Sequence, residues 1–135
     1  MRDINTSFVK NEDELKEFIS NTPYSSDDGS YDIDDHINEV NDAIRWIDDE
    51  LTMLRKAADV MSWYDITYNV DEYKDMVLQL TNKKNDLFMY SVNVKSLLYE
   101  KQRVCGHDEK FVRYIGYDHG HEYHICDNCG KDFKD

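Results

Sequence analysis

Residues 33–61 carry an apolar pattern that restricts the chain to very few folds. From Ile33 to Met61, apolar side chains follow one another at alternating spacings of four and three residues. This spacing places them on one face of a helix and repeats as heptads. The a positions are Ile37, Ile44, Leu51 and Ala58, and the d positions are Val40, Ile47, Leu54 and Met61. The sequence therefore predicts a long amphipathic helix that needs a partner element on its apolar face.

A second helix is predicted from about residue 71 to residue 103. The segment before it, Ile66–Val70, is rich in β-branched and aromatic residues, so we expect a bend between Asp65 and Asp71. Lys84 and Ser91 interrupt the second heptad pattern. Its expected core residues are Tyr73, Met76, Val77, Leu80, Leu87, Tyr90, Val94, Leu97 and Leu98. Two helices of about 30 residues joined by a short bend predict an antiparallel coiled-coil hairpin, about 45 Å long.

Acidic residues recur on the first helix, opposite its apolar face. Asp35, Asp42 and Asp49 share heptad position f, and Asp34 and Asp48 lie beside them at position e. Residues 1–59 hold 16 acidic and 6 basic side chains, a net charge of −10 out of −13 for the whole chain. Such a surface repels nucleic acid and membrane phosphates and attracts basic proteins. We expect these five aspartates to bind a partner with a basic surface; the alternative is that the acidic face is simply solvated and serves solubility.

The first helix also carries an apolar flank wider than a two-helix seam requires. Trp46, Met53 and Val60 share position c, next to Ala43 and Ala57 at position g. We expect this flank to be covered as part of the core. The N-terminal helix would cover it most economically, and a second copy of the chain is the alternative, so a homodimer is also compatible with the sequence.

Before the hairpin, the pattern is weaker. Asn11 and Glu14 form a capping-box pattern that predicts a short helix at about residues 12–20. Residues 22–30 are rich in turn-forming residues and predict a linker. The expected organisation is an N-terminal segment at 1–30, a helical hairpin at 31–103 and a C-terminal metal-binding element at 104–135. The predicted fold class is mainly α with a small β-hairpin.

The C-terminal element contains two closely spaced pairs of metal-binding residue types. Cys105 and His107 precede a predicted β-hairpin of residues 111–117 and 122–125, and Cys126 and Cys129 follow it. Four thiolate and imidazole ligands fill the tetrahedral shell that Zn²⁺ prefers, which predicts a structural ion and not a catalytic one.

This order of ligand pair, hairpin and ligand pair resembles a zinc ribbon over residues 104–133. The second pair matches the Cys-x-x-Cys-Gly knuckle of that family, whereas Cys105-Gly106-His107 has one spacer and a histidine. His107 is the expected fourth ligand because it alone pairs with Cys105. His119, His121 and His124 remain alternatives at this stage.

The rest of the sequence favours a cytoplasmic binding protein over an enzyme. No apolar run is long enough for a signal peptide or a membrane span, and an odd number of cysteines used on a metal suits a reducing compartment. Phosphate loops, nucleophile elbows and His-Glu-x-x-His motifs are absent from the sequence. We therefore expect no catalytic residues, no membrane contact and no direct nucleic-acid binding by the N-terminal half.

Two function hypotheses follow. In the first, the acidic helix face docks on a basic nucleic-acid-handling or defence protein of a bacterial host and blocks it. In size and charge the chain resembles small acidic anti-restriction and anti-CRISPR inhibitors, which act as DNA mimics, and its composition fits a phage gene acting in the host cytoplasm.

In the second hypothesis, the chain is a transcription regulator. An antiparallel coiled coil followed by a zinc finger resembles the DksA/TraR regulators, which implies insertion of the coiled-coil tip, with Asp65 and Asp71, into the secondary channel of RNA polymerase. A third reading, nucleic-acid binding by the metal-binding element, rests on its basic and aromatic residues: Lys110, Phe111, Arg113, Tyr114, Tyr123, Lys131 and Lys134.

Overall fold

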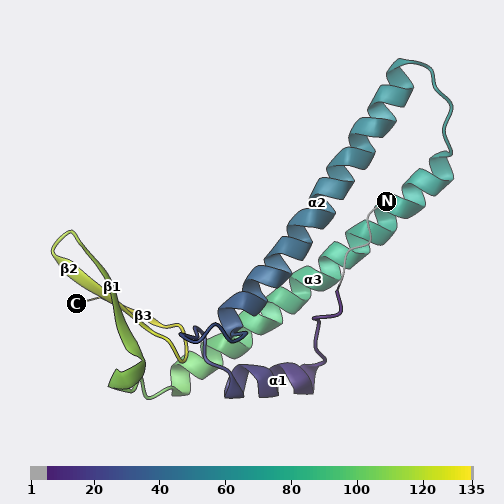
Figure 1. Cartoon of the computed structure of the whole chain (residues 1–135). Coiled ribbons are helices and arrows are strands. Elements are labelled where there is room, and N and C mark those ends of the chain that lie inside the picture. Colours follow the sequence, from purple (N-terminus) through teal and green to yellow (C-terminus); the bar gives the residue numbers. More distant parts are fainter. Residues whose placement is uncertain (1–5, 135) are drawn as a thin grey trace. The chain divides into compact units, whose positions relative to one another are not determined.

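The chain is mainly α with a small antiparallel sheet, as the sequence predicts. Figure 1 presents a computed structural model, which describes residues 6–134. The helices are α1 (Glu12–Asn21), α2 (Ile33–Trp63) and α3 (Val70–Val104). A single 3₁₀ turn (Glu109–Phe111) leads into the strands β1 (Val112–Asp118), β2 (His121–Cys126) and β3 (Asp132–Lys134). The predicted helices and the hairpin strands are present within a few residues of their expected bounds, whereas β3 was not anticipated.

Polar side chains define where each helix begins. The Asn11 side chain accepts a hydrogen bond from the Glu14 amide at 2.8 Å, which confirms the predicted N-cap of α1. Asn69 caps α3 in the same way through the Glu72 amide at 3.0 Å. At the start of α2, the Asp32 carboxylate accepts from the Asp35 amide at 2.8 Å. These caps satisfy amides that have no partner inside their helices.

The described residues divide into two compact units, and both long helices contribute to each. Unit 1 contains Glu39–Ser91 with the described residues before Lys10. Unit 2 contains Lys10–Asn38 and the chain from Val92 onward. Figure 1 shows α2 and α3 running antiparallel and side by side through unit 1.

Unit 1 is held together by the heptad face of α2 and the facing side of α3. Its buried cluster is Ala43, Ile47, Leu51, Leu80 and Leu87, against which Phe8, Ile44, Leu54 and Val77 pack. Lys84, which interrupts the heptads of α3, forms an ion pair with Asp48 on α2 at 2.6 Å. The interruption therefore adds a polar link between the two helices at the edge of the apolar seam.

The prediction that Trp46, Met53 and Val60 belong to the core is wrong. Their exposed fractions are 41%, 64% and 43%, although Ala43 at the neighbouring g position is buried. The buried face of α2 in unit 1 thus includes Ala43 but not Ala57, which is exposed, and it stops short of position c. Two packed helices cover only one side of each other, and among the described residues of unit 1 position c stays exposed.

Unit 2 has a core that mixes apolar and polar side chains. Leu15 and Ile19 of α1, Val94 of α3 and Ile33 of α2 are buried, and so is His36, with no exposed surface. The His36 ring lies 5.1 Å from the Phe18 ring, and its Nδ1 forms a hydrogen bond of 2.6 Å with the Tyr31 hydroxyl. Burial lowers the pKa of His36 to about 4, with a further contribution from the positive charge of Lys10.

The sheet belongs to unit 2 and has the strand order β1-β2-β3, with both pairs antiparallel. The register of β1 shifts between Tyr114 and Gly116, which places a bulge at Ile115. No helix among the described residues is long and apolar enough to cross a membrane. The sheet brings the end of β2 to the segment that follows α3, where the metal-binding residue types meet.

Candidate metal centre

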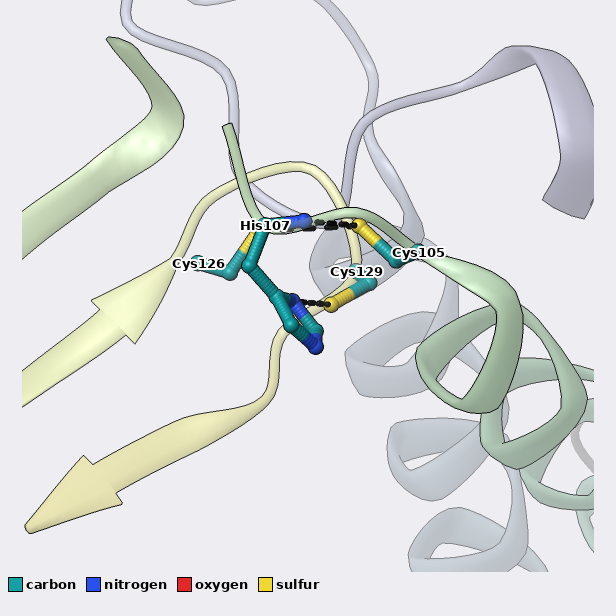
Figure 2. Close-up of side chains that lie close together, drawn as sticks. All are labelled: Cys105, His107, Cys126 and Cys129. Atoms are coloured by element: carbon teal, nitrogen blue, oxygen red, sulfur yellow. Dashed lines mark hydrogen bonds between the residues drawn. The ribbon is translucent and has the colours of Figure 1, made fainter. Parts of the chain in front are cut away.

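Cys105, His107, Cys126 and Cys129 converge at one point in unit 2. One ligand atom from each of these residues lies within 4.8 Å of the others, and both Cys126 and Cys129 are buried. Figure 2 shows the four side chains pointing inward from the segment after α3 and from the end of β2 and the turn that follows it. The sequence predicted this grouping, and three sulfurs with one imidazole make a donor set that can hold a metal ion such as zinc.

The separations between the ligand atoms suit a tetrahedral ion. With Zn–S bonds of about 2.3 Å and Zn–N bonds of about 2.0 Å, tetrahedral angles place sulfurs about 3.8 Å apart and sulfur about 3.5 Å from nitrogen. The sulfurs of Cys105 and Cys126 are 4.0 Å apart, and the Cys129 sulfur is 3.5 Å from Nδ1 of His107. These two separations are close to the tetrahedral values, and all four ligand atoms lie within 4.8 Å of one another.

Local backbone geometry presents the ligands. Cys105 continues the last turn of α3, since its amide donates to the Lys101 carbonyl at 2.9 Å. His107 has φ +50°, a left-handed conformation that turns the chain back toward Cys105. In the second pair, Gly130 has φ +77° and its amide donates to the Cys126 carbonyl at 2.7 Å. Glycine fits here because a side chain would strain this conformation.

Hydrogen bonds to sulfur support thiolates at the cluster. The His107 amide lies 3.4 Å and the Asn128 side-chain nitrogen 3.6 Å from the Cys105 sulfur. Burial raises the pKa of the Cys105 thiol, but these donors outweigh burial and bring the pKa below its usual value. Burial raises the pKa of Cys129 to about 12. An ion would therefore have to displace a proton from Cys129 at neutral pH.

His107 completes the cluster, and the other three candidate histidines lie elsewhere. The imidazole of His119 is 88% exposed in the β1–β2 turn. His124 packs against Tyr114 with ring centroids 5.5 Å apart. His121 is paired with Asp118 in the antiparallel register of β1 and β2. The pairing of Cys105 with a residue two positions later thus pointed to the histidine that lies in the cluster, and its role as the fourth ligand stays a prediction.

The linker between α1 and α2 (residues 22–32) docks on the second ligand pair. The Tyr24 amide donates to the Asn128 carbonyl at 3.0 Å, and the Ser25 amide donates to the Asp127 carbonyl at 2.9 Å. The linker is also tied to the start of α2, because the Asp34 amide donates to the Tyr24 carbonyl at 3.0 Å. The metal cluster is therefore connected to the N-terminal end of α2 through backbone hydrogen bonds.

Side chains reinforce this connection. The Tyr24 ring lies over Gly130 so closely that a Cβ at position 130 would come within 2.6 Å of it. Gln102 of α3 donates to the Cys129 carbonyl at 3.1 Å. The hydroxyl of Tyr24 lies 3.4 Å from the Asp34 carboxylate, and burial, with that carboxylate, raises the pKa of Tyr24.

Lys101 provides a further link within unit 2. Its ammonium donates to the Ile19 carbonyl at 2.9 Å and to the Thr22 carbonyl at 2.5 Å. The last turn of α1 contains no basic residue, so Lys101 places the positive charge that the C-terminal end of a helix favours. Burial lowers the pKa of Lys101, while the nearby cysteines oppose that shift.

The predicted partner-binding aspartates differ in their surroundings. Asp35 and Asp49 are exposed, whereas Asp34, Asp42 and Asp48 are half-buried. Asp42 pairs with Arg45 at 2.7 Å, in addition to the pair between Asp48 and Lys84. At the predicted tip, Asp65 and Asp71 are exposed in and just after the segment that joins α2 to α3, and Asp65 has φ +54°.

Sequence reasoning missed the residues that attach the linker and α1 to the cluster. Tyr24, Lys101 and Gln102 act through backbone carbonyls, and such contacts leave no spacing pattern in the sequence. Asp32 caps the start of α2. Its only signal in the sequence was the position of an aspartate directly before Ile33.

No family model matches the chain, and neither the curated proteins nor the solved structures contain a significant match. The protein is therefore defined by its own features: a mainly α chain with a helical hairpin, a small sheet and a Cys₃His cluster.

Proposed function

We propose that this protein is an acidic, zinc-stabilised binding protein that acts by occupying the basic surface of a nucleic-acid-handling protein. The observation that carries the proposal is the concentration of negative charge in residues 1–59, much of it on α2. The proposed activity is binding and inhibition, without a catalytic step. The zinc ion, held in a ribbon-like element by the Cys₃His cluster, has a structural role.

The zinc part of this proposal is supported by the donor set and by the buried position of two of its sulfurs. A closed shell of four protein ligands leaves no site for a reacting water. The ion would stabilise a small sheet whose exposed fractions are high along β1. Cobalt substitution tests this: Co²⁺ in a tetrahedral thiolate site gives intense visible absorption, and Cys126→Ser should lose it. Absence of that absorption from the wild-type chain would contradict the assignment.

The acidic part is supported by charge and exposure at Asp35 and Asp49. Exposed carboxylates attract a basic groove that normally holds phosphates, and association is steered over a distance. The ion pairs of Asp42 with Arg45 and of Asp48 with Lys84 reduce the local charge, so these two aspartates contribute less than the two exposed ones.

Competition with DNA tests the proposed partner class. The immobilised chain should capture a DNA- or RNA-binding protein from a bacterial lysate, and duplex DNA or raised salt should release it. The variant Asp35→Asn/Asp49→Asn should lose the captured protein, whereas Asp65→Asn/Asp71→Asn, with the same loss of charge at the tip, should retain it. Capture that persists in the first variant would exclude the acidic face of α2.

The tip of the hairpin is a second candidate, favoured by a specific observation. Trp63 and Tyr64 are 75% and 74% exposed, and Ile66 is 52% exposed. Exposed aromatic side chains are frequent anchors of protein interfaces. In this alternative the tip, with Asp65 and Asp71, enters a channel of a partner such as RNA polymerase. Trp63→Ala/Tyr64→Ala would then abolish capture, while Asp35→Asn/Asp49→Asn would leave it intact.

A further inference from the structure

Helix α2 carries a second heptad seam within unit 1, separate from the one that packs on α3. Trp46, Glu50, Met53, Ala57 and Val60 follow one another at alternating spacings of four and three. Four of these five side chains are apolar. We call them the outer seam. The face of α2 that packs on α3, with Ile47 and Leu51, is the inner seam. Unlike the inner seam, the outer seam is open to solvent, and Met53 at its centre is 64% exposed.

Along one border of the outer seam, the charges of one helix are complementary to those of a second, antiparallel copy. At 100° per residue, Asp49 and Lys56 lie on the same side of Met53, one turn before it and one turn after it. Both are exposed. When two such helices meet antiparallel, the acidic position of each therefore faces the basic position of the other.

We propose that the outer seam binds a second copy of this chain, with the two α2 helices antiparallel about a twofold axis near Met53. Trp46 of each copy then lies against Ala57 and Val60 of the other, so a large side chain meets two smaller ones. Asp49 of each copy lies near Lys56 of the other. A twofold interface of this kind uses the same surface on both chains, so that surface must be complementary to itself. Asp49 and Lys56 meet this requirement. The inference rests on the outer seam and not on the proposed function, although both use Asp49.

Charge determines how strong this dimer is and how it responds to salt. Each chain carries a net charge of −13. The like net charge of the two copies opposes association, so the dimer is concentration-dependent and salt strengthens it by screening the repulsion. This response is opposite in sign to that expected for binding to a basic partner, so the two proposals fail separately.

Sedimentation equilibrium of the metal-loaded chain, over a range of concentrations at low and high salt, tests the proposal. We expect a monomer–dimer equilibrium that shifts toward dimer by severalfold at high salt. A monomer under all conditions would overturn it, and so would a dimer that dissociates as salt is added.

Two variants test which surface is used. Met53→Glu should shift the equilibrium to monomer by at least tenfold. Leu78→Glu is the matched control, because Leu78 is a similarly exposed apolar residue of unit 1, 57% exposed, that lies outside the seam. Both positions are exposed, so circular dichroism should show unchanged helix content. Equal effects of the two variants, or no effect of Met53→Glu, would contradict the seam.

A charge exchange tests the antiparallel arrangement. Lys56→Asp should weaken the dimer severalfold, because two like charges then face each other. Adding Asp49→Lys should restore the wild-type dissociation constant, since the pair is rebuilt in reverse. In a parallel dimer Lys56 would not face Asp49, so a double variant that stays as weak as Lys56→Asp would overturn the proposed orientation.

Discussion

The two units of this protein reach a folded state by different means. Unit 1 buries a uniform apolar cluster from α2 and α3 and places its charged residues outside. Unit 2 has a smaller apolar core and adds a buried histidine, the ammonium of Lys101 on backbone carbonyls and the Cys₃His cluster. Periodic packing is sufficient for long helices, whereas short, irregular segments depend on specific polar contacts, which a metal ion in the Cys₃His cluster would reinforce.

This difference predicts that the two units respond to different perturbations. A cluster of apolar side chains is insensitive to chelators and responds mainly to lost volume. A metal cluster with hydrogen-bonded linkers responds to chelation, and a buried histidine responds to pH. Four perturbations separate the units, beginning with the largest.

Metal removal should have the largest effect, and only on unit 2. Structural zinc contributes on the order of 10 kcal/mol in small domains that cannot fold without it. Chelation should therefore abolish hydrogen-exchange protection of β1–β3 and of the Tyr24 and Ser25 amides, which donate to the second ligand pair. Protection of the amides around Ile47 should persist. Cys126→Ser without chelator should reproduce this pattern, and equal loss in both units would contradict the comparison.

Ile47→Ala should destabilise unit 1 by about 2–5 kcal/mol, because it leaves a cavity in a fully buried site. Urea denaturation monitored by the unit 1 amides measures the change. Met53→Ala removes a similar volume from an exposed position and should change stability by less than about 0.5 kcal/mol. Comparable losses in the two variants would mean that the inner seam is not the core.

His36 should make unit 2 sensitive to mild acid. Its pKa of about 4 lies below the value of about 6.5 in an unfolded chain, so the unfolded state takes up the proton first as pH falls. Stability is unaffected above about pH 7 and decreases between about pH 6.5 and pH 4, by up to roughly 3 kcal/mol. His36→Gln should flatten this dependence in denaturation curves, although it loses some stability at every pH.

The exposed histidine at position 119 is the control for this experiment, because its imidazole is 88% exposed. His119→Gln should leave the pH dependence unchanged. If His119→Gln and His36→Gln flatten the curve equally, the acid sensitivity does not arise from the buried site.

Gly130→Ala should have the smallest of the four effects, a loss of about 1–3 kcal/mol in unit 2. It combines a left-handed backbone position with the close approach of the Tyr24 ring. Gly120→Ala shares the positive φ, +82°, but meets no atom within 4 Å. The difference between these two variants in thermal denaturation reports the contact with Tyr24. Equal losses would show that this contact contributes nothing.

Features that depend on a local sequence pattern could be predicted, whereas features that depend on the rest of the fold could not. The spacing of Ile47 and Leu51 predicted the seam that packs on α3, and the pairing of Cys105 with His107 predicted the cluster of residues that could hold a metal ion. Both are local patterns with a physical period or a ligand spacing. The exposure of Met53 could not be predicted, because an apolar helix position indicates burial only when the number of covering elements is known.

Contacts between distant segments were also beyond prediction. Tyr24 meets the second ligand pair through its amide and ring, and Lys101 binds the end of α1 through carbonyls. Neither interaction depends on a residue pattern that a single sequence displays. The third strand was missed for a related reason, since Asp132–Lys134 is short and pairs with β2 at only a few positions.

The bonds from Tyr24 and Ser25 to Asn128 and Asp127 also have a consequence for folding during synthesis. The joined segments are about a hundred residues apart, so closing this loop costs more chain entropy than forming a local turn. On the ribosome, the linker has no binding site until Cys126 and Cys129 have emerged. The inner seam of unit 1 can form earlier, so the grouping of the four ligand residues and the attachment of the linker come last. A chain truncated before Cys126 would retain its helices but leave the linker unattached and open to proteases.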